Sequence, residues 1–431
     1  MKAAGRGSID GLPEVALPSN GVTTPDTEPP SQLPTSLRWL AVGTFALGTE
    51  AFVIAGVLPE IADDLQVSQS AVGFLVAMFA LTYGLSAPIV NSAVARREPK
   101  MVLRTAMGLF VLANFTAAAA PTFATLLAAR MIAGVFAAAF APTASATASE
   151  LAHKSQRGRA LAVVFGGMSM AMVAGVPLGT VLSDIGSWRT TFVFVAMLGA
   201  VAGVGIHVFV PAVHRSTPVA RRRPMSVLRT AGVRRCLAVA VLVRAADFAV
   251  FTYLAAIVTD IYGNPRVTVP VVLLVNGSVG WFGTTMSGKR TDREGAQRAR
   301  SIAIAGSAVG LALLVAASNS NGLVAQVVAV PALVVWSFSA WGFGPPQQSR
   351  LLDLAPEAPV TALAINASAT QIGIGLGGLV GAVTVAASTS ASIPMVGVVL
   401  AVAALALSRR ASPAGALLNT SPHTNNRKGP R

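Results

Sequence analysis

The chain has 431 residues, of which 53% are apolar and only 11% are charged, and its mean hydropathy is +0.65. Soluble globular proteins carry roughly a quarter charged residues, so this composition excludes a single soluble domain. The 32 Lys and Arg residues outnumber the 17 Asp and Glu residues, and the formal net charge is +15. The one cysteine, Cys236, excludes an intrachain disulfide and a multi-thiolate metal site, and the four histidines show no metal-ligand spacing.

Residues 1–37 are polar and rich in proline, which predicts a disordered cytoplasmic tail. No signal peptide is expected, because there is no basic start followed by an apolar core and a small-residue cleavage site. From Trp39 onward, apolar runs alternate with short breaks. The runs are about 20 residues long, which is the length a helix needs to cross a bilayer. The predicted transmembrane helices cover residues 39–58, 70–90, 102–120, 122–146, 160–183, 190–210, 236–259, 268–287, 301–318, 322–343, 361–386 and 392–408.

Basic residues gather in alternate loops of this pattern, such as RREPKMVLR, HKSQRGR and GKRTDREGAQRAR. Arg130 and Arg244 lie inside predicted spans and Arg189 and Arg266 in loops of the other set, which leaves 28 of the 32 basic residues on one side, tails included. Because cytoplasmic loops carry the excess of Lys and Arg, both termini are predicted to be cytoplasmic in a multi-pass protein of the inner or plasma membrane. The positive charge then reflects topology and contact with anionic lipids, and no nucleic-acid partner is expected.

The predicted spans form two sets of six, separated by the basic linker 211–235. Glu50 lies in the first span and Asp247 in the seventh, and in each case the second span of the set ends 41 residues later, at Asn91 and Gly288. This repeat predicts an all-α polytopic membrane protein with two six-helix halves, 38–210 and 236–408, and a cytoplasmic tail over 409–431. In transporters built from such repeats, the substrate site lies near mid-bilayer between the halves.

Glu50 and Asp247 are the only acidic residues well inside a predicted span. A charge at the centre of a membrane helix costs about 2.5–3.5 kcal/mol, so each acid is expected to face a wet cavity or a cationic partner. At a rise of 1.5 Å per residue, Glu50 and Arg130 lie at matching depths of roughly 17 and 18 Å from the inner face. Arg244 precedes Asp247 by three residues and can reach it along one helix face. The candidate proton-coupling residues are therefore Glu50, Arg130 and Asp247, while the alternative is two structural ion pairs that hold helices together.

Aromatic and amide side chains inside the spans are candidates for lining the substrate cavity, although aromatic rings also serve packing. Trp39, Trp281 and Trp341 are instead predicted to serve packing or the membrane interface. The candidate substrate-binding residues are Phe52, Phe248, Phe251, Tyr253, Trp336, Asn366 and Gln371.

The loop after the eighth predicted span reads GKRTDREG, which resembles the loop signature of the major facilitator superfamily, Gly-x-x-x-Asp-Arg-x-Gly with trailing basic residues, here Arg298 and Arg300. The matching loop of the first half departs from the signature, because Asn91, Ala95 and Glu98 stand in place of its Gly, Asp and second Gly. The resemblance implies a gating role for the residues that match in the two loops: Arg96, Lys100, Gly288, Asp292, Arg293 and Gly295.

The fifth predicted span contains GGMSMAMVAGVPLGT, which is similar to the antiporter motif of that superfamily through Gly167, Gly175, Pro177 and Gly179. Small residues let helices approach closely and proline bends a helix. LLAARMIAG around Arg130, SWRTTF at 187–192 and the stretch 351–378 extend the resemblance. Over residues 38–408 the chain resembles the twelve-helix drug:proton antiporter branch, which includes phenicol-resistance and arabinose-type sugar exporters.

The resemblance implies proton-coupled efflux of a small amphipathic compound, such as an antibiotic, by alternating access. The energy source would be the proton gradient with no cofactor or metal, and a monomer is expected. Export of a sugar or another metabolite on the same fold is the alternative. An integral-membrane enzyme is not expected, because the chain offers no nucleophile–base set and no HExxH-type metal spacing.

Overall fold

The computed structural model describes residues 33–153, 156–212 and 228–409 of the chain. Most of the predicted tail 1–37, most of the predicted linker 211–235 and residues 410–431 of the predicted C-terminal tail lie outside the described residues. Within the described ranges the secondary structure is helical, and no strand occurs.

The helices that precede residue 213 belong to the predicted first half. They are α1 (Ser36–Asp64), α2 (Gln69–Val94), α3 (Pro99–Ala118), α4 (Phe123–Leu151), α5 (Arg157–Met170), the π-helical turn η2 (Ala171–Gly175), α6 (Val176–Ile185) and α7 (Trp188–Phe209).

The helices that follow residue 227 belong to the predicted second half. They are α9 (Ala231–Thr252), α10 (Leu254–Tyr262), α11 (Pro265–Glu294), α12 (Ala296–Ser318), α13 (Gly322–Gly342), α14 (Gly344–Leu354), α15 (Pro359–Ala387), the 3-10 turn η3 (Ser390–Ser392) and α16 (Ile393–Arg409).

Eleven segments of the described chain are long and apolar enough to cross a membrane, and a twelfth is obtained when α9 and α10, which meet at an angle of 49°, are counted as one broken span. Each predicted span corresponds to one of these segments, so the all-α polytopic fold with twelve spans is confirmed. The seventh span differs from the expectation, because the predicted continuous helix over 236–259 is interrupted at Tyr253.

The fifth span is also irregular, because η2 interrupts it between α5 and α6. Pro177 lies at the start of α6 and has no backbone N–H, so it cannot bond to a carbonyl group one turn earlier. In transmembrane helices, a local π adjustment can re-satisfy the backbone groups that a proline leaves without a partner. Pro177 of the candidate antiporter motif therefore accounts for the π-helical interruption of the fifth span.

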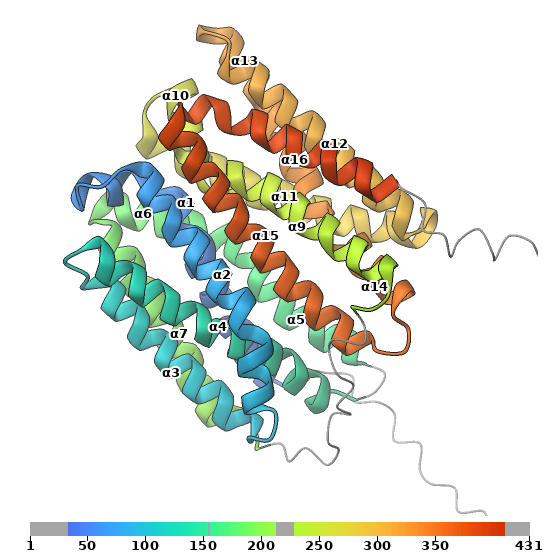
Figure 1. Cartoon of the computed structure of the whole chain (residues 1–431). Helices are drawn as coiled ribbons and strands as arrows, with labels where there is room; N and C mark the ends of the chain where they lie inside the picture. The colour runs from blue at the N-terminus through green and yellow to red at the C-terminus, as the bar shows by residue number, and fades with distance from the viewer. Residues whose placement is uncertain (1–32, 154–155, 213–227, 410–431) are drawn as a thin grey trace, which may run out of the picture.

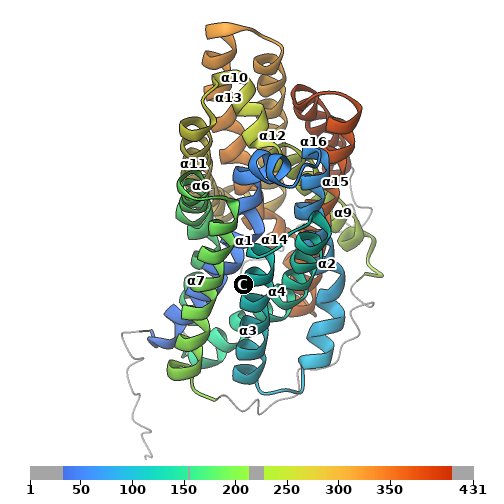
Figure 2. The same ribbon diagram turned by 90° about the vertical axis from the view of Figure 1, so that its left-hand side faces the viewer.

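The helices gather into two groups that lie side by side, α1–α7 and α9–α16 (Figures 1 and 2). Along the boundary α2 packs against α15, while α11 packs against η2 and α6, and α1 contacts α10. In Figure 1 the blue α2 and the orange-red α15 run next to each other. The observed fold thus consists of two six-helix halves with pairs of helices from different halves in contact.

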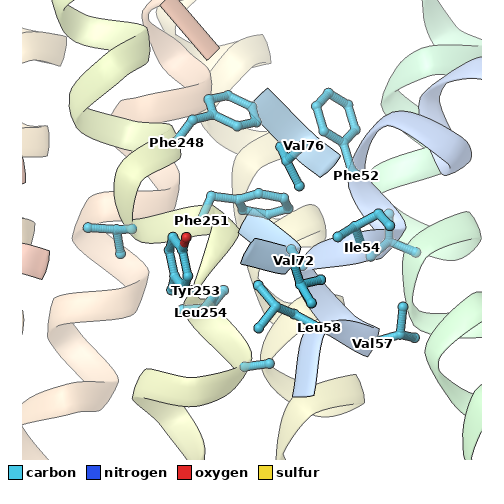
Figure 3. Packing of buried hydrophobic residues seen from close by; sticks show 14 of the residues in the cluster. Phe52, Ile54, Val57, Leu58, Val72, Val76, Phe248, Phe251, Tyr253 and Leu254 are labelled. Carbon is cyan, nitrogen blue, oxygen red and sulfur yellow. The ribbon is translucent and has the colours of Figure 1, made fainter. Parts of the chain in front are cut away.

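The apolar core shows which end of the two halves is closed. One cluster joins both halves and includes Ile54, Leu58 and Val72 of the first half and Phe251 and Leu254 of the second (Figure 3). These residues lie toward the end of the molecule that holds the α1–α2 turn. At the other end the apolar clusters are separate, one within the first half and two within the second. Among the described residues, the halves therefore share an apolar core at one end only.

Candidate functional site

Glu50 of α1 and Arg130 of α4 form a completely buried ion pair. The Nη1 group of Arg130 donates to Oε1 of Glu50 and also to its backbone carbonyl, at 2.8 Å. The guanidinium lies 4.5 Å from the ring centroid of Phe79 on α2, so the pair joins three helices. The Oε2 atom of Glu50 and the Nε and Nη2 atoms of Arg130 are buried and have no hydrogen-bond partner among the residues that the structure describes. The pair is thus completely buried and incompletely satisfied, which is costly inside a membrane protein.

Asp247 of α9 is held differently. Its Oδ1 atom accepts from the Ser307 hydroxyl at 2.7 Å and from the Trp336 indole N–H at 3.3 Å. Its Oδ2 atom lies 3.7 Å from Nη1 of Arg244 and has no hydrogen-bond partner within the described part of the chain, while that Nη1 donates to the Ala340 carbonyl at 3.1 Å. Asp247 is therefore fixed by α12 and α13 and has its cation on its own helix, whereas Glu50 has its cation on another helix.

Four rings from both halves meet at the boundary of the halves, and we call Phe52, Phe248, Phe251 and Trp341 the aromatic cluster. Phe52 comes from the first half, and its ring centroid lies 5.6, 6.0 and 5.9 Å from those of Phe248, Phe251 and Trp341. Figure 3 shows Phe52 on α1 opposite Phe248 and Phe251 on α9. The tilted and edge-to-face arrangements are those that aromatic pairs prefer. A ring of a bound compound could replace one of these contacts at the boundary of the halves.

The other candidate substrate-binding residues lie outside the aromatic cluster. Tyr253 is buried at the break between α9 and α10, and its hydroxyl finds no hydrogen-bond partner in the ranges that the structure describes. Trp336 is buried and bonded to Asp247. Asn366 is buried and accepts from Gln347 Nε2 at 3.2 Å, and Gln371 is half-buried on α15. The structure therefore brings together three of the seven predicted residues, all of them phenylalanines.

Several residues near the site were not identified from the sequence. Trp341 was predicted to serve packing or the interface, yet it belongs to the aromatic cluster. Asn276 is buried in the middle of α11 and is bonded to both Ser337 and Trp341. A lone amide inside a predicted span was the available signal for Asn276, because polar groups in a membrane need partners.

Arg300 is a second residue that the sequence placed elsewhere, among the trailing basic residues of the loop after the eighth span. The structure buries it in α12 with 4% exposure. Its Nη1 group donates to Cys236 Sγ and to Gln347 Oε1, both at 3.2 Å, and its Nη2 group donates to Gln297 Oε1 at 2.8 Å. Arg300 therefore organises the polar cluster that also contains Asn366 through Gln347.

The glycines of the candidate antiporter motif all face α1. A Cβ atom at Gly167 would collide with the Ala41 carbonyl, one at Gly175 with the Thr49 hydroxyl, and one at Gly179 would lie 2.5 Å from a methyl group of Val53. In addition, Thr44 of α1 donates to the Val164 carbonyl of α5 at 2.6 Å. The motif thus allows the fifth span to pack directly against the helix that carries Glu50.

The candidate gating loops lie at the surface. Arg96, Asp292 and Arg293 are exposed, Lys100 is half-buried, and a Cβ at Gly288 would meet no atom within 4 Å. Gly295 ends α11 with φ +84° and donates its N–H to the Thr291 carbonyl at 3.0 Å. This left-handed conformation favours glycine and explains one residue of the signature.

Comparison with known proteins agrees with this architecture. The sequence model of the Major Facilitator Superfamily matches residues 40–378. The chain is similar to a chloramphenicol resistance protein of Streptomyces lividans, with 35% identity over 86% of this chain and 95% of that protein. It is also similar to the inner membrane transport protein YdhP of Escherichia coli strain K12, with 29% identity over 85% and 93% of the two chains.

A solved structure shares the fold. The nucleoside transporter NupG superposes with a TM-score of 0.70 at 15% sequence identity, covering 86% of this chain and 98% of that one. Together with the twelve apolar spans and the match over most of the sequence, these similarities show that the protein is a membrane-embedded transporter of small molecules and not an enzyme. The chain belongs to the major facilitator superfamily.

Proposed function

We propose that this protein exports a small amphipathic compound, such as an antibiotic, in exchange for protons. The observation that carries the proposal is the Glu50–Arg130 pair, a buried carboxylate whose cation sits on a different helix. A charge pair inside a membrane span is expensive and marks ion and proton pathways. The similarity to a chloramphenicol resistance protein supports an antibiotic as the cargo.

The pair offers a simple way to couple a proton to movement. Protonation of Glu50 removes its charge and leaves Arg130 with the Glu50 carbonyl and the Phe79 ring as contacts. Arg130 then gains freedom to rearrange, and the helices that the pair joins are released from it. Asp247 is the second candidate, but Arg244 moves with it because both belong to α9. Glu50 is therefore the proposed main coupling residue, modulated by Arg130.

The aromatic cluster supports a compound with an apolar, aromatic face. It contributes four rings at the boundary of the halves. Sugar or metabolite export is the alternative, and a hydroxyl-rich sugar would need several hydrogen-bonding groups in the same place. The energy source is the proton gradient without a cofactor, and the working unit is a monomer.

Orientation completes the proposal. With both termini in the cytoplasm of an inner or plasma membrane, the shared apolar cluster closes the outer side and the separate clusters lie at the inner side. This arrangement suits a protein that takes its cargo from the cytoplasm and alternates to an outward-open state. The surface loops around Arg96 and Asp292 and the α1–α5 contact of the antiporter motif would govern that change.

Export by proton exchange predicts that inside-out vesicles with an acidic interior accumulate chloramphenicol, and that a protonophore collapses the accumulation. An efflux-deficient host expressing the protein should also grow at higher concentrations of some members of an antibiotic panel. Vesicles lacking the protein are the control. Accumulation seen only in right-side-out vesicles would contradict export.

The predicted topology is tested with an alkaline phosphatase reporter, which is active only outside the cytoplasm. A fusion after Arg410 should be inactive, because the basic loops place that end inside. A fusion after Asn319, in the exposed turn between α12 and α13, should be active and serves as the matched control. The reverse pattern would overturn the orientation.

A further inference from the structure

We propose that Asn276 is a specificity-determining residue, which positions the indole of Trp341 as the wall against which the aromatic ring of a substrate packs. This inference rests on the proposed transport of an aromatic compound. It names a subsite, its positioning residue and the chemical class that it takes, namely a compound with a flat aromatic ring.

Both ends of the Asn276 amide are used. Its Nδ2 group donates to the Ser337 hydroxyl at 2.7 Å, and its Oδ1 atom accepts from the Trp341 indole N–H at 3.2 Å. Asn276 is only 2% exposed, so water cannot replace these partners. A buried amide without partners is costly, and the two bonds therefore fix its orientation and that of the indole.

Three residues of α11 at intervals of four hold Trp341, and such residues lie on one helix face. Asn276 bonds to the indole nitrogen, Gly280 lies so close that a Cβ there would collide with the indole, and the Thr284 hydroxyl donates to the Trp341 carbonyl at 3.1 Å. The face of α11 thus clamps both the backbone and the ring of Trp341. These three specific contacts position the ring, and general packing does not.

Trp341 is the accessible member of the aromatic cluster. Phe248 and Phe251 are each 2% exposed and Phe52 is 9% exposed, whereas Trp341 is only partly buried. Its ring meets those of the three phenylalanines edge-on, with centroids 5.9 to 6.3 Å apart. The angle of the indole would therefore decide which aromatic rings of a substrate can pack against it.

Chloramphenicol binding to the purified full chain in detergent, measured by isothermal titration, tests the inference. Asn276→Ala is expected to raise the Kd for chloramphenicol about tenfold, as for a lost buried hydrogen bond. Trp341→Phe, which lacks the N–H donor, is expected to do the same. The double variant should be no weaker than the worse single variant, because both changes break one interaction.

Asn114 provides a matched control. It is 1% exposed in α3 of the first half and donates only to the Phe110 carbonyl of its own helix, at 2.9 Å. Asn114→Ala should leave the Kd unchanged. In inside-out vesicles Asn276→Ala should raise KM for chloramphenicol about tenfold while changing Vmax less than twofold, a split that general damage to the fold does not produce.

The inference is overturned if Asn276→Ala binds chloramphenicol like the wild type, if the factors of the two single variants multiply in the double variant, or if the wild type does not bind chloramphenicol. Binding needs no proton gradient. A wild type that binds but does not accumulate chloramphenicol would contradict the proposed proton-driven export while leaving the subsite supported, so the two failures are distinguishable.

Discussion

Replacing Glu50 by glutamine is expected to abolish accumulation of substrate against its gradient, while downhill exchange of substrate continues. Glutamine keeps the size and the hydrogen-bonding capacity of the side chain but cannot release a proton. Substrate-induced proton release by the purified protein should disappear in the same variant. The vesicle accumulation assay and a pH-sensitive dye provide the two measurements.

The buried position of the pair requires a folding control. Glu50→Gln leaves Arg130 buried without a counter-charge, and removing one partner of a buried pair typically costs about 3–5 kcal/mol. The variant Glu50→Gln with Arg130→Met removes both charges, so its thermal unfolding should return toward that of the wild type while accumulation stays absent. If Glu50→Gln still concentrates substrate with unchanged proton release, the coupling site lies elsewhere.

The variant Asp247→Asn is expected to behave differently from Glu50→Gln. Asparagine can still accept from Ser307 and Trp336 through its oxygen atom, so only the charge opposite Arg244 is lost. This variant is therefore expected to lower stability and substrate affinity but to retain proton-driven accumulation. Equal loss of coupling in both variants would assign the proton to the two acids jointly.

The fold could be predicted from the sequence because few backbone structures satisfy their own hydrogen bonds inside a lipid bilayer. Apolar runs of bilayer length must be helices, and each predicted span was found. The ends were underestimated where polar residues extend a helix beyond the apolar run, as in α1, which continues through Glu60 to Asp64. The break at Tyr253 has no proline or glycine beside it. The break arises from tertiary packing, and a hydropathy profile carries no signal for tertiary packing.

The candidate site was predictable where simple geometry decides it. A constant rise per residue places Glu50 and Arg130 at one depth, and the structure joins them. The rise per residue gives the depth of a residue but not the rotation of its helix about the helix axis. The sequence therefore did not indicate that Trp341 faces the phenylalanines or that Asn276 holds it. Arg300 was assigned to a loop because the predicted span began at 301, whereas α12 begins at Ala296 and carries Arg300 into the interior.

Gly277 gives the second large expected effect, because it is where α11 of the second half touches the backbone of the first. A Cβ atom there would collide with the Met172 carbonyl oxygen and would lie 2.9 Å from the Cα atom of Val173. Both belong to η2, whose backbone cannot rotate away as a side chain can. Gly277→Ala should therefore push the halves apart at this contact, at a cost of about 1–3 kcal/mol.

A transporter that alternates between two states must return to each of them. A penalty of that size on one state shifts the equilibrium by roughly 5- to 150-fold. The rate of chloramphenicol accumulation in inside-out vesicles should accordingly fall at least about fivefold in Gly277→Ala. Thermal unfolding should shift by no more than the cost of this one contact, about 1–3 kcal/mol.

The matched control is Gly108→Ala in α3, where a Cβ would meet no atom within 4 Å. The same change in the same kind of helix should leave the accumulation rate within about twofold of the wild type, because nothing is displaced. A Gly277→Ala protein as fast as Gly108→Ala would show that the contact between α11 and η2 can loosen without affecting transport. A large loss confined to Gly277→Ala would instead identify this contact as one on which the cycle depends, adjacent in the chain to the residue that holds Trp341.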